Sequence, residues 1–188
     1  MEISVRDLFT MLHGMGFGAL LLLGFPLAIV EVTRMSGAQS VSAREEILLS
    51  RFLWVMAAVA WMAVLLGAYL IYPYYRVRPP AGVSDLAMYP RSLLLSSATT
   101  SGWHDIGMEW KEHVAWLAPM ILTMVAWIFG RYGAIGISRH PETRRVVLVL
   151  MVTAFLAAGT AGGFGAMLNK FAPVRGGAVI HLMQGEAP

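Results

Sequence analysis

The chain contains no cysteine and few charged residues. Charged side chains make up 13% of its 188 residues and hydrophobic ones 57%, whereas soluble domains carry roughly 25% charged residues. The lack of cysteine excludes disulfides, thiolate metal sites, iron–sulfur clusters and the C-x-x-C-H attachment of c-type haem. The shortage of charge indicates an integral membrane protein rather than a soluble enzyme.

Four apolar runs are long enough to cross a hydrocarbon core, which needs about 20 residues of helix. They lie at residues 8–32, 52–72, 108–129 and 146–168. Because every backbone group in lipid must be satisfied within its own segment, these runs are predicted to be helices. We expect an all-α fold, a single domain over 1–188 that forms a four-transmembrane-helix bundle. A long extramembrane loop over 76–107 joins the second and third helices, and a tail covers 170–188.

The first apolar run is too long for the core of a signal peptide and lacks a small-residue cleavage site, so we expect it to remain in the mature protein. With four spans, both termini and the 76–107 loop share one side, which we call side A. Side B has two short connections rich in arginine: Arg34, Arg44, Arg51, Arg131, Arg139, Arg144 and Arg145. The positive-inside bias favours a cytoplasmic side B, in a bacterial-type inner (plasma) membrane with periplasmic termini. It also explains the net charge of +3 without a nucleic-acid partner.

Two of the five histidines lie near the side-A ends of different apolar runs. His13 is about five residues into the first run, or about 7 Å deep at 1.5 Å per residue. His113 lies near the start of the third. Facing imidazoles on two helices of a bundle are what a six-coordinate haem iron requires. A polar residue inside a span is also a functional-site hypothesis by default, so His13 and His113 are candidate axial ligands of one haem b.

The surroundings of His13 suit a flat cofactor, because Gly14, Gly16 and Gly18 remove side chains from this helix. At the side-A end of the second run, Arg76 and Arg78 follow three tyrosines. Arginine binds carboxylates bidentately, so both are candidates for the haem propionates. The alternatives are also common in membranes: closely spaced glycines serve helix packing, and tyrosine and arginine are routine interfacial anchors.

These features together resemble the small four-helix membrane cytochrome b subunits of respiratory complexes. The resemblance is architectural and rests on His13, His113 and the glycine-rich helices. It implies a membrane-anchoring haem-b subunit of a membrane oxidoreductase complex. Such a subunit transfers electrons between a quinone pool and a redox partner on the outer face, alongside other subunits.

The resemblance also implies roles for the two carboxylates beside His113. Glu109 and Glu112 are candidate proton acceptors for a quinol, by general-base chemistry. Glu109 is four residues before His113, so it is also placed to orient that imidazole.

Other interpretations stay open. His104 and His181 are alternative ligands, the first nine residues before His113 and the second in the tail. The chain is alternatively a non-redox scaffold or assembly subunit whose histidines only form hydrogen bonds. It is alternatively a pigment- or metal-binding helical bundle, since histidine also ligates chlorophyll and copper.

Overall fold

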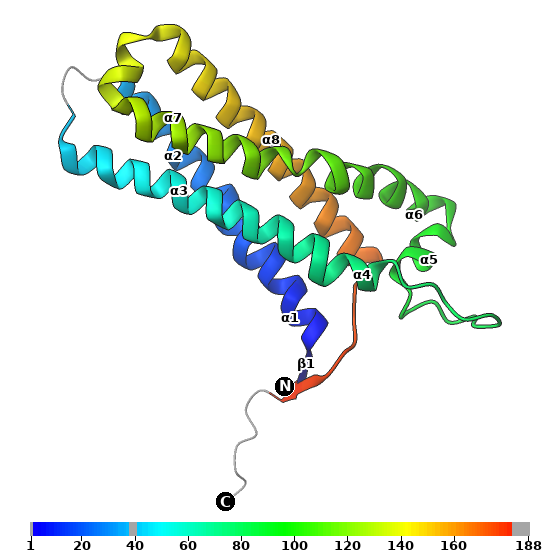
Figure 1. Ribbon diagram of the computed structural model, residues 1–188. Helices are drawn as coiled ribbons and strands as arrows, with labels where there is room; N and C mark the ends of the chain where they lie inside the picture. Colours follow the sequence, from blue (N-terminus) through cyan, green and yellow to red (C-terminus); the bar gives the residue numbers. More distant parts are fainter. Residues whose placement is uncertain (1, 38–40, 182–188) are drawn as a thin grey trace, which may run out of the picture.

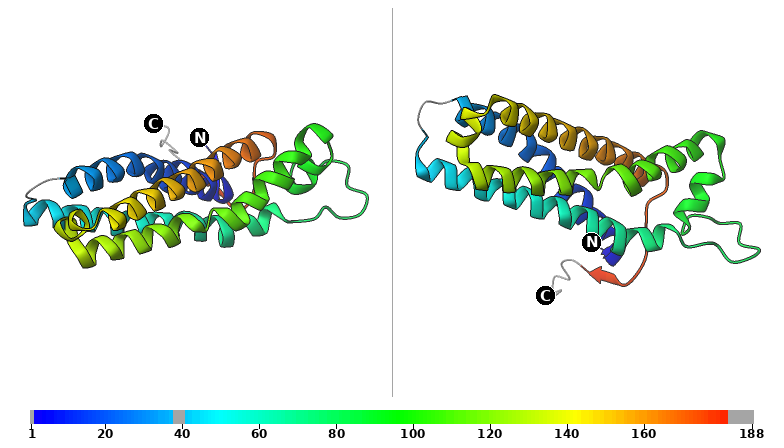
Figure 2. Two further views of the ribbon diagram at one scale, coloured as in Figure 1. Left: turned by 90° about the horizontal axis from the view of Figure 1, so that it is seen from above. Right: turned by 45° about the horizontal axis from the view of Figure 1, so that its top comes forward.

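Four long helical stretches dominate the structure, a computed structural model that describes residues 2–37 and 41–181. They run side by side as one elongated bundle (Figures 1 and 2). Each is long and apolar enough to cross a membrane: Val5–Met35, Ala43–Tyr75, Ala98–Arg139 and Pro141–Phe171. The prediction of a mainly helical protein with four membrane-length helices is confirmed, and it supports a multi-pass membrane protein.

Wider, π-helical turns interrupt three of these stretches. The first comprises α1 (Val5–Met11), η1 (Leu12–Gly18) and α2 (Ala19–Gly37), and the second α3 (Ala43–Leu66), η2 (Gly67–Ile71) and α4 (Tyr72–Tyr75). The third comprises α6 (Ala98–Gly102), η3 (Trp103–Met108), η4 (Trp110–Val114) and α7 (Leu117–Arg139), and the fourth is α8 (Pro141–Phe171). The four π-helical segments η1 to η4 all belong to the side-A half of the bundle. Such turns occur frequently at functional sites because they redirect side chains.

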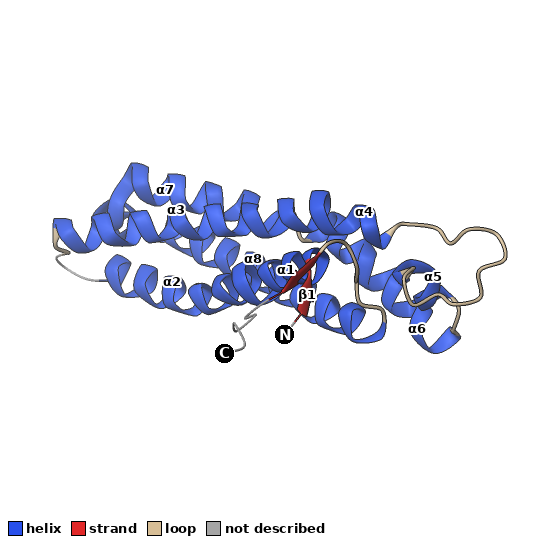
Figure 3. Cartoon of the chain, turned by 90° about the horizontal axis from the view of Figure 1, so that it is seen from below, coloured by secondary structure: helices blue, strands red, loops and turns tan. Residues whose placement is uncertain are grey.

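The connection between the second and third stretches contains more helix than the predicted 76–107 loop. Residues 76–89 lack helix, α5 (Pro90–Leu95) follows, and α6 already begins at Ala98 (Figure 3). The side chain of Ser97 caps α6 by accepting from the backbone N–H of Thr99 (3.3 Å). Trp103 then packs edge-on against Phe164 of α8. A cap and a contact between helices thus extend this helix beyond its apolar run.

Local signals set the starts of the other long helices. Ser4 and Asp7 form a reciprocal capping box at α1, and Ser42 and Glu45 form another at α3. Each pair satisfies backbone N–H groups that the first helical turn would leave without a partner. α8 begins at Pro141, whose missing N–H costs nothing at that position.

The main core lies among α2, α3, α7 and α8. Each helix contributes a fully buried side chain: Phe25, Leu53, Leu122 and Met151. Trp61 of α3 donates from its indole N–H to the hydroxyl oxygen of Thr123 on α7 (3.0 Å). Apolar packing therefore holds the centre of the bundle, with a polar link between two neighbouring helices.

The two ends of the bundle correspond to sides A and B of the sequence. The α2–α3 and α7–α8 connections lie at one end, and the N-terminal strand, α4 and α5 lie toward the other (Figure 1). At side A, β1 (Glu2–Ser4) pairs antiparallel with β2 (Val179–His181), with Glu2 opposite His181. Part of the predicted irregular tail therefore forms a strand that joins the two ends of the chain.

Gly133 bends α7 near side B, with φ 63° and ψ 176°. This conformation is essentially restricted to glycine. A Cβ atom at this position would also collide with the carboxylate of Glu46 on α3. Glycine is therefore required here by backbone conformation and by space.

Gly133→Ala is expected to destabilise the protein by about 1–3 kcal/mol, the usual cost of a strained backbone residue. Thermal and SDS-induced unfolding of the purified protein measure the effect. Gly130→Ala is the matched control, because a Cβ at 130 meets its nearest atom at 3.5 Å and alanine favours helix over glycine. Equal losses in both variants would contradict the prediction.

Candidate functional site

His13 points from η1 into the bundle toward the second long helix. Its Nδ1 lies 2.8 Å from the carbonyl oxygen of Ala63, and because that oxygen only accepts, Nδ1 carries the hydrogen. The imidazole lies against Gly67, where a Cβ would come within 2.8 Å of the histidine Cε1. Glycine at 67 therefore provides the space that the ring occupies.

His113 points away from the bundle. Its Nδ1 lies 3.1 Å from the backbone oxygen of Glu109 and 3.3 Å from that residue's carboxylate, on the same helix. The side chains of His113 and Glu109 are 70% and 71% exposed. The structure therefore does not bring His13 and His113 together as the facing pair that one haem iron needs.

Lys111, two residues before His113, points inward from η4 toward α8. Its Nζ lies 3.0 Å from the place that a Cβ of Gly165 on α8 would take, and it interacts electrostatically with His13. The third helix thus presents an ammonium group to His13, at the level where the sequence predicted a second imidazole.

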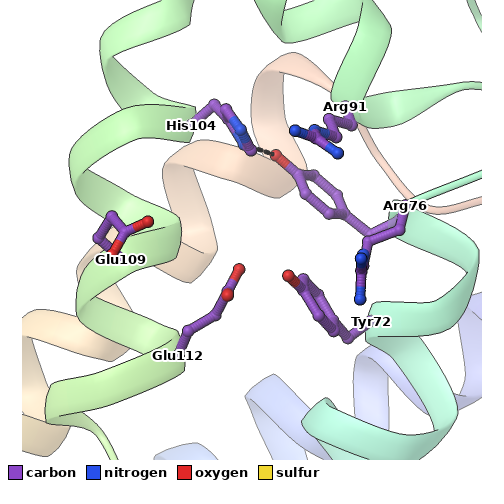
Figure 4. A pocket seen from close by; sticks show the side chains of 7 residues that line it. Tyr72, Arg76, Arg91, His104, Glu109 and Glu112 are labelled. Atoms are coloured by element: carbon purple, nitrogen blue, oxygen red, sulfur yellow. Dashed lines mark hydrogen bonds between the residues drawn. The ribbon is translucent and has the colours of Figure 1, made fainter.

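A polar pocket of about 170 Å³ opens beside these helices at side A (Figure 4). The second helix supplies Tyr72 and Tyr75, and Arg76 directly follows it. The rest of the lining consists of Arg91 from α5, His104 from η3, Glu109 at the N-terminal cap of η4, and Glu112 from η4. Three of the lining residues are predicted site residues (Arg76, Glu109 and Glu112), and a fourth, His104, is an alternative ligand.

One hydrogen bond joins the two main walls of the pocket. The hydroxyl of Tyr75 lies 2.6 Å from Nδ1 of His104, and Tyr75 is only 5% exposed. The ring of Tyr72 stacks on Tyr75 at 6.2 Å between centroids, and the Arg76 guanidinium lies 5.3 Å from the centre of the Tyr72 ring. These contacts hold the aromatic wall in one position.

The pocket keeps opposite charges apart. Within the part of the chain that the structure describes, neither Arg76 nor Arg91 forms an ion pair with Glu109 or Glu112. The Glu112 carboxylate faces the hydroxyl of Tyr72 (Figure 4). Nε of Arg91 is buried and has no hydrogen-bond partner among the described residues. A buried donor left without an acceptor costs about 1–3 kcal/mol, and Nε is too enclosed to reach a ligand in the pocket. The donors that a ligand could meet are the terminal guanidinium nitrogens of Arg76 and Arg91.

The remaining predicted residues lie outside the pocket. Arg78 is exposed in the 76–89 segment. Gly16 lies within η1, where an added Cβ would meet Leu12 at 3.8 Å and the carbonyl oxygen of Met11 at 4.0 Å. His181 belongs to β2, and its Nδ1 lies 3.2 Å from the carboxylate of Glu2. These three residues do not line the pocket, and His181 contributes to the pairing of β1 with β2.

Two residues of this region escaped the sequence interpretation. Arg91 lies in the segment predicted as loop, and its position between the buried Pro90 and Leu94 indicates an arginine held against protein. Lys111 lies between the predicted site residues Glu109 and His113 but is not among them. An ammonium group inside a membrane-length helix is the signal that points to it.

No metal cluster accompanies the pocket: residues 2–37 and 41–181 hold no group of three or more His, Asp or Glu side chains placed to bind a metal ion. The chain was also compared with protein-family models, curated proteins and solved structures. Nothing matches. The geometry of this chain alone therefore indicates its function.

Tyr75→Phe is expected to lower the unfolding free energy by about 1 kcal/mol, because it leaves His104 Nδ1 without its partner at 2.6 Å while keeping the ring. Thermal unfolding measures the change. Tyr74→Phe is the matched control, since the ring of Tyr74 stays available to the Arg6 guanidinium 3.9 Å away. A loss in the Tyr74 variant as large as in the Tyr75 variant would refute the assignment.

Proposed function

We propose that the protein is a subunit of a membrane oxidoreductase complex that binds the head group of a quinone or quinol in the side-A pocket. One observation carries the proposal. The pocket places two guanidinium groups that have no ion-pair partner among the described residues, those of Arg76 and Arg91, beside a carboxylate, Glu112. A quinone ring has two carbonyl oxygens that accept hydrogen bonds, and the quinol has two hydroxyl groups that donate them.

The size of the pocket suits one ring. Its volume of about 170 Å³ is below the roughly 300–1,000 Å³ of pockets that enclose drug-sized ligands. A single substituted ring fits this space, and its isoprenoid tail would remain among the lipid chains. The pocket lies at the end of four apolar helices, at the boundary between the membrane interior and water. An amphipathic quinone places its ring and its tail on the two sides of such a boundary.

Glu112 is the carboxylate that faces the pocket. Oxidation of a quinol releases two electrons and two protons, and Glu112 is placed to accept a proton by general-base chemistry. Glu109 is turned toward His113 and is the weaker candidate. The electrons pass to a redox centre of a partner subunit. With the arginine-rich side B in the cytoplasm, protons leave on the outer side of a bacterial plasma membrane.

A haem b held by His13 and His113 remains a prediction of the sequence, and the placement of these side chains does not fit it. His13 has the Nδ1–carbonyl bond typical of metal-ligating histidines, but its ring lies against Gly67, and His113 is on the outer face. The proposed proton transfer at Glu112 therefore does not involve a haem. A reduced-minus-oxidised absorption spectrum of the purified protein answers this question separately.

A structural role for the same residues is the second candidate, and the Tyr75–His104 bond favours it. This bond links α4 to η3, so the polar cluster would close the side-A end of a non-redox scaffold. The two functions differ in the expected role of Arg91, because its guanidinium lines the pocket and forms no ion pair among the described residues and would bind a ligand only under the first.

Arg91→Gln is expected to weaken binding of a short-chain quinone, decylubiquinone, about tenfold or more. A hydrogen bond from a charged group contributes about 1.5–3 kcal/mol, and 1.4 kcal/mol is tenfold in affinity. Equilibrium titration of the detergent-solubilised protein measures the affinity. Arg78→Gln is the matched control, an exposed arginine outside the pocket, and should bind as the wild type does. Unchanged affinity in the Arg91 variant would favour the scaffold.

Glu112→Gln is expected to weaken binding of the quinol about tenfold and to leave binding of the quinone nearly unchanged. Only the quinol offers a hydroxyl to the carboxylate, and hydrogen bonds to charged acceptors contribute about 1.5–3 kcal/mol. Parallel titrations with reduced and oxidised decylubiquinone measure both affinities. Glu109→Gln is the control, because its carboxylate lies against His113. A change in Glu109→Gln alone would assign the proton acceptor to the other carboxylate.

A further inference from the structure

A second hollow lies on the outer surface of the bundle, toward side B and away from the quinone pocket. It is a groove of about 400 Å³ between α3 and α7, lined by Ser50, Trp54, Trp127, Gly130 and Arg131. The two indoles are 45% and 57% exposed. In a membrane-spanning bundle this surface faces lipid.

Gly130 forms the floor of the groove. Ser50 and Trp54 lie one turn apart on α3, and Trp127 and Arg131 lie one turn apart on α7. A Cβ at position 130 would lie 3.5 Å from the Ser50 hydroxyl oxygen and 4.0 Å from Nε1 of Trp54. Two donors therefore meet above a residue that has no side chain, and the guanidinium of Arg131 adjoins them.

These donors have no acceptor within the described part of the chain. Ser50 Oγ, Trp54 Nε1 and the Arg131 guanidinium form no hydrogen bond or ion pair there, and the recorded contact of Arg131 is with the Tyr132 ring at 5.8 Å. Two other indoles of the same bundle do have acceptors. Trp61 donates to Thr123 and Trp110 to the carbonyl oxygen of Ala157.

The charge near the groove is positive. Arg131 and the neighbouring Arg51 are exposed and have no ion-pair partner within residues 2–37 and 41–181. The nearest acid on α3, Glu46, turns its carboxylate to Gly133 and does not line the groove. An anionic occupant therefore meets three donors and no opposing carboxylate in the lining.

We propose that this groove binds an anionic phospholipid. Its phosphate oxygens accept from Arg131, Ser50 and Trp54, and an acyl chain lies along the exposed faces of Trp54 and Trp127. The apolar surface continues toward the bundle centre through Met124 and Met120 on the same face of α7. Two other occupants match the groove less well. A free phosphate would accept from the donors but leave the indoles uncovered. A second apolar helix would cover the indoles but leave the donors without acceptors.

The depth of the groove agrees with this occupant. Ser50 precedes the apolar run 52–72, and Arg131 follows the run 108–129, so the donors lie at the level where phosphate groups begin. Aromatic residues are enriched at that level in membrane proteins. The site is separate from the quinone pocket and does not depend on its function.

The test uses the full-length protein in mixed micelles and measures bound lipid by native mass spectrometry, with phosphatidylglycerol and phosphatidylcholine of the same acyl chains. The wild type is expected to prefer phosphatidylglycerol about fivefold or more. Arg131→Gln should weaken phosphatidylglycerol binding about fivefold, since an arginine near an anionic lipid surface contributes about 1 kcal/mol. Gly130→Leu should remove bound lipid by filling the groove. Arg139→Gln, also exposed and at side B, is the control and should bind as the wild type.

Four results would overturn the proposal. Equal binding of both lipids, or equal binding by wild type and Arg131→Gln, would remove the phosphate contact. Inorganic phosphate that binds as tightly as phosphatidylglycerol would indicate a free-anion site. A dimer that Gly130→Leu converts to a monomer, measured by light scattering, would assign the groove to a second copy of this chain. Thermal unfolding of each variant separates loss of binding from loss of fold.

Discussion

The hydrogen-bonding requirement of the backbone in lipid underlies the whole structure. Without water, each N–H and C=O must be satisfied inside its own segment, so four long helices form and their polar side chains gather at the two ends. The centre is held by apolar packing of residues such as Leu53 and Leu122. The chemistry that remains is confined to a polar pocket at side A and a donor-lined groove toward side B. Both use donors that have no acceptor within the described residues, and this shared property favours bound ligands over purely structural roles.

The sequence predicted the helices well and their contacts poorly. Hydropathy locates runs of about 20 apolar residues, and all four runs lie within the observed helices. Depth along a helix also follows from counting residues. The direction in which a side chain points does not, because each residue turns a helix by about 100° and the π-helical segments η3 and η4 change that count. This is why His113 lies on the outer face although its depth resembles that of His13. His104, Arg76 and Glu112 were named as site residues, but their meeting in one pocket depends on how α4 and η3 pack together, which no local pattern encodes.

Glycine has three distinct uses in this bundle. Gly67 makes room for the imidazole of His13, Gly133 adopts a backbone conformation that other residues avoid, and Gly130 leaves the floor of the groove open. The residue type is the same at all three positions, so the sequence alone does not distinguish these uses. The atoms around each glycine show whether it makes room for a side chain, adopts a strained backbone conformation or leaves a binding surface open. A substitution at each position therefore tests a different property.

The β1–β2 pair has a consequence for how the protein is made. Glu2 lies opposite His181, so this contact joins the beginning of the chain to a segment synthesised after the fourth helix. The β1 segment, which precedes the first helix, must therefore reach side A and remain unpaired until α8 has crossed the membrane and brought β2 to the same side. A chain with one helix left out or inverted would present the two strands on opposite faces of the bilayer. Formation of this short sheet thus depends on correct insertion of all four helices.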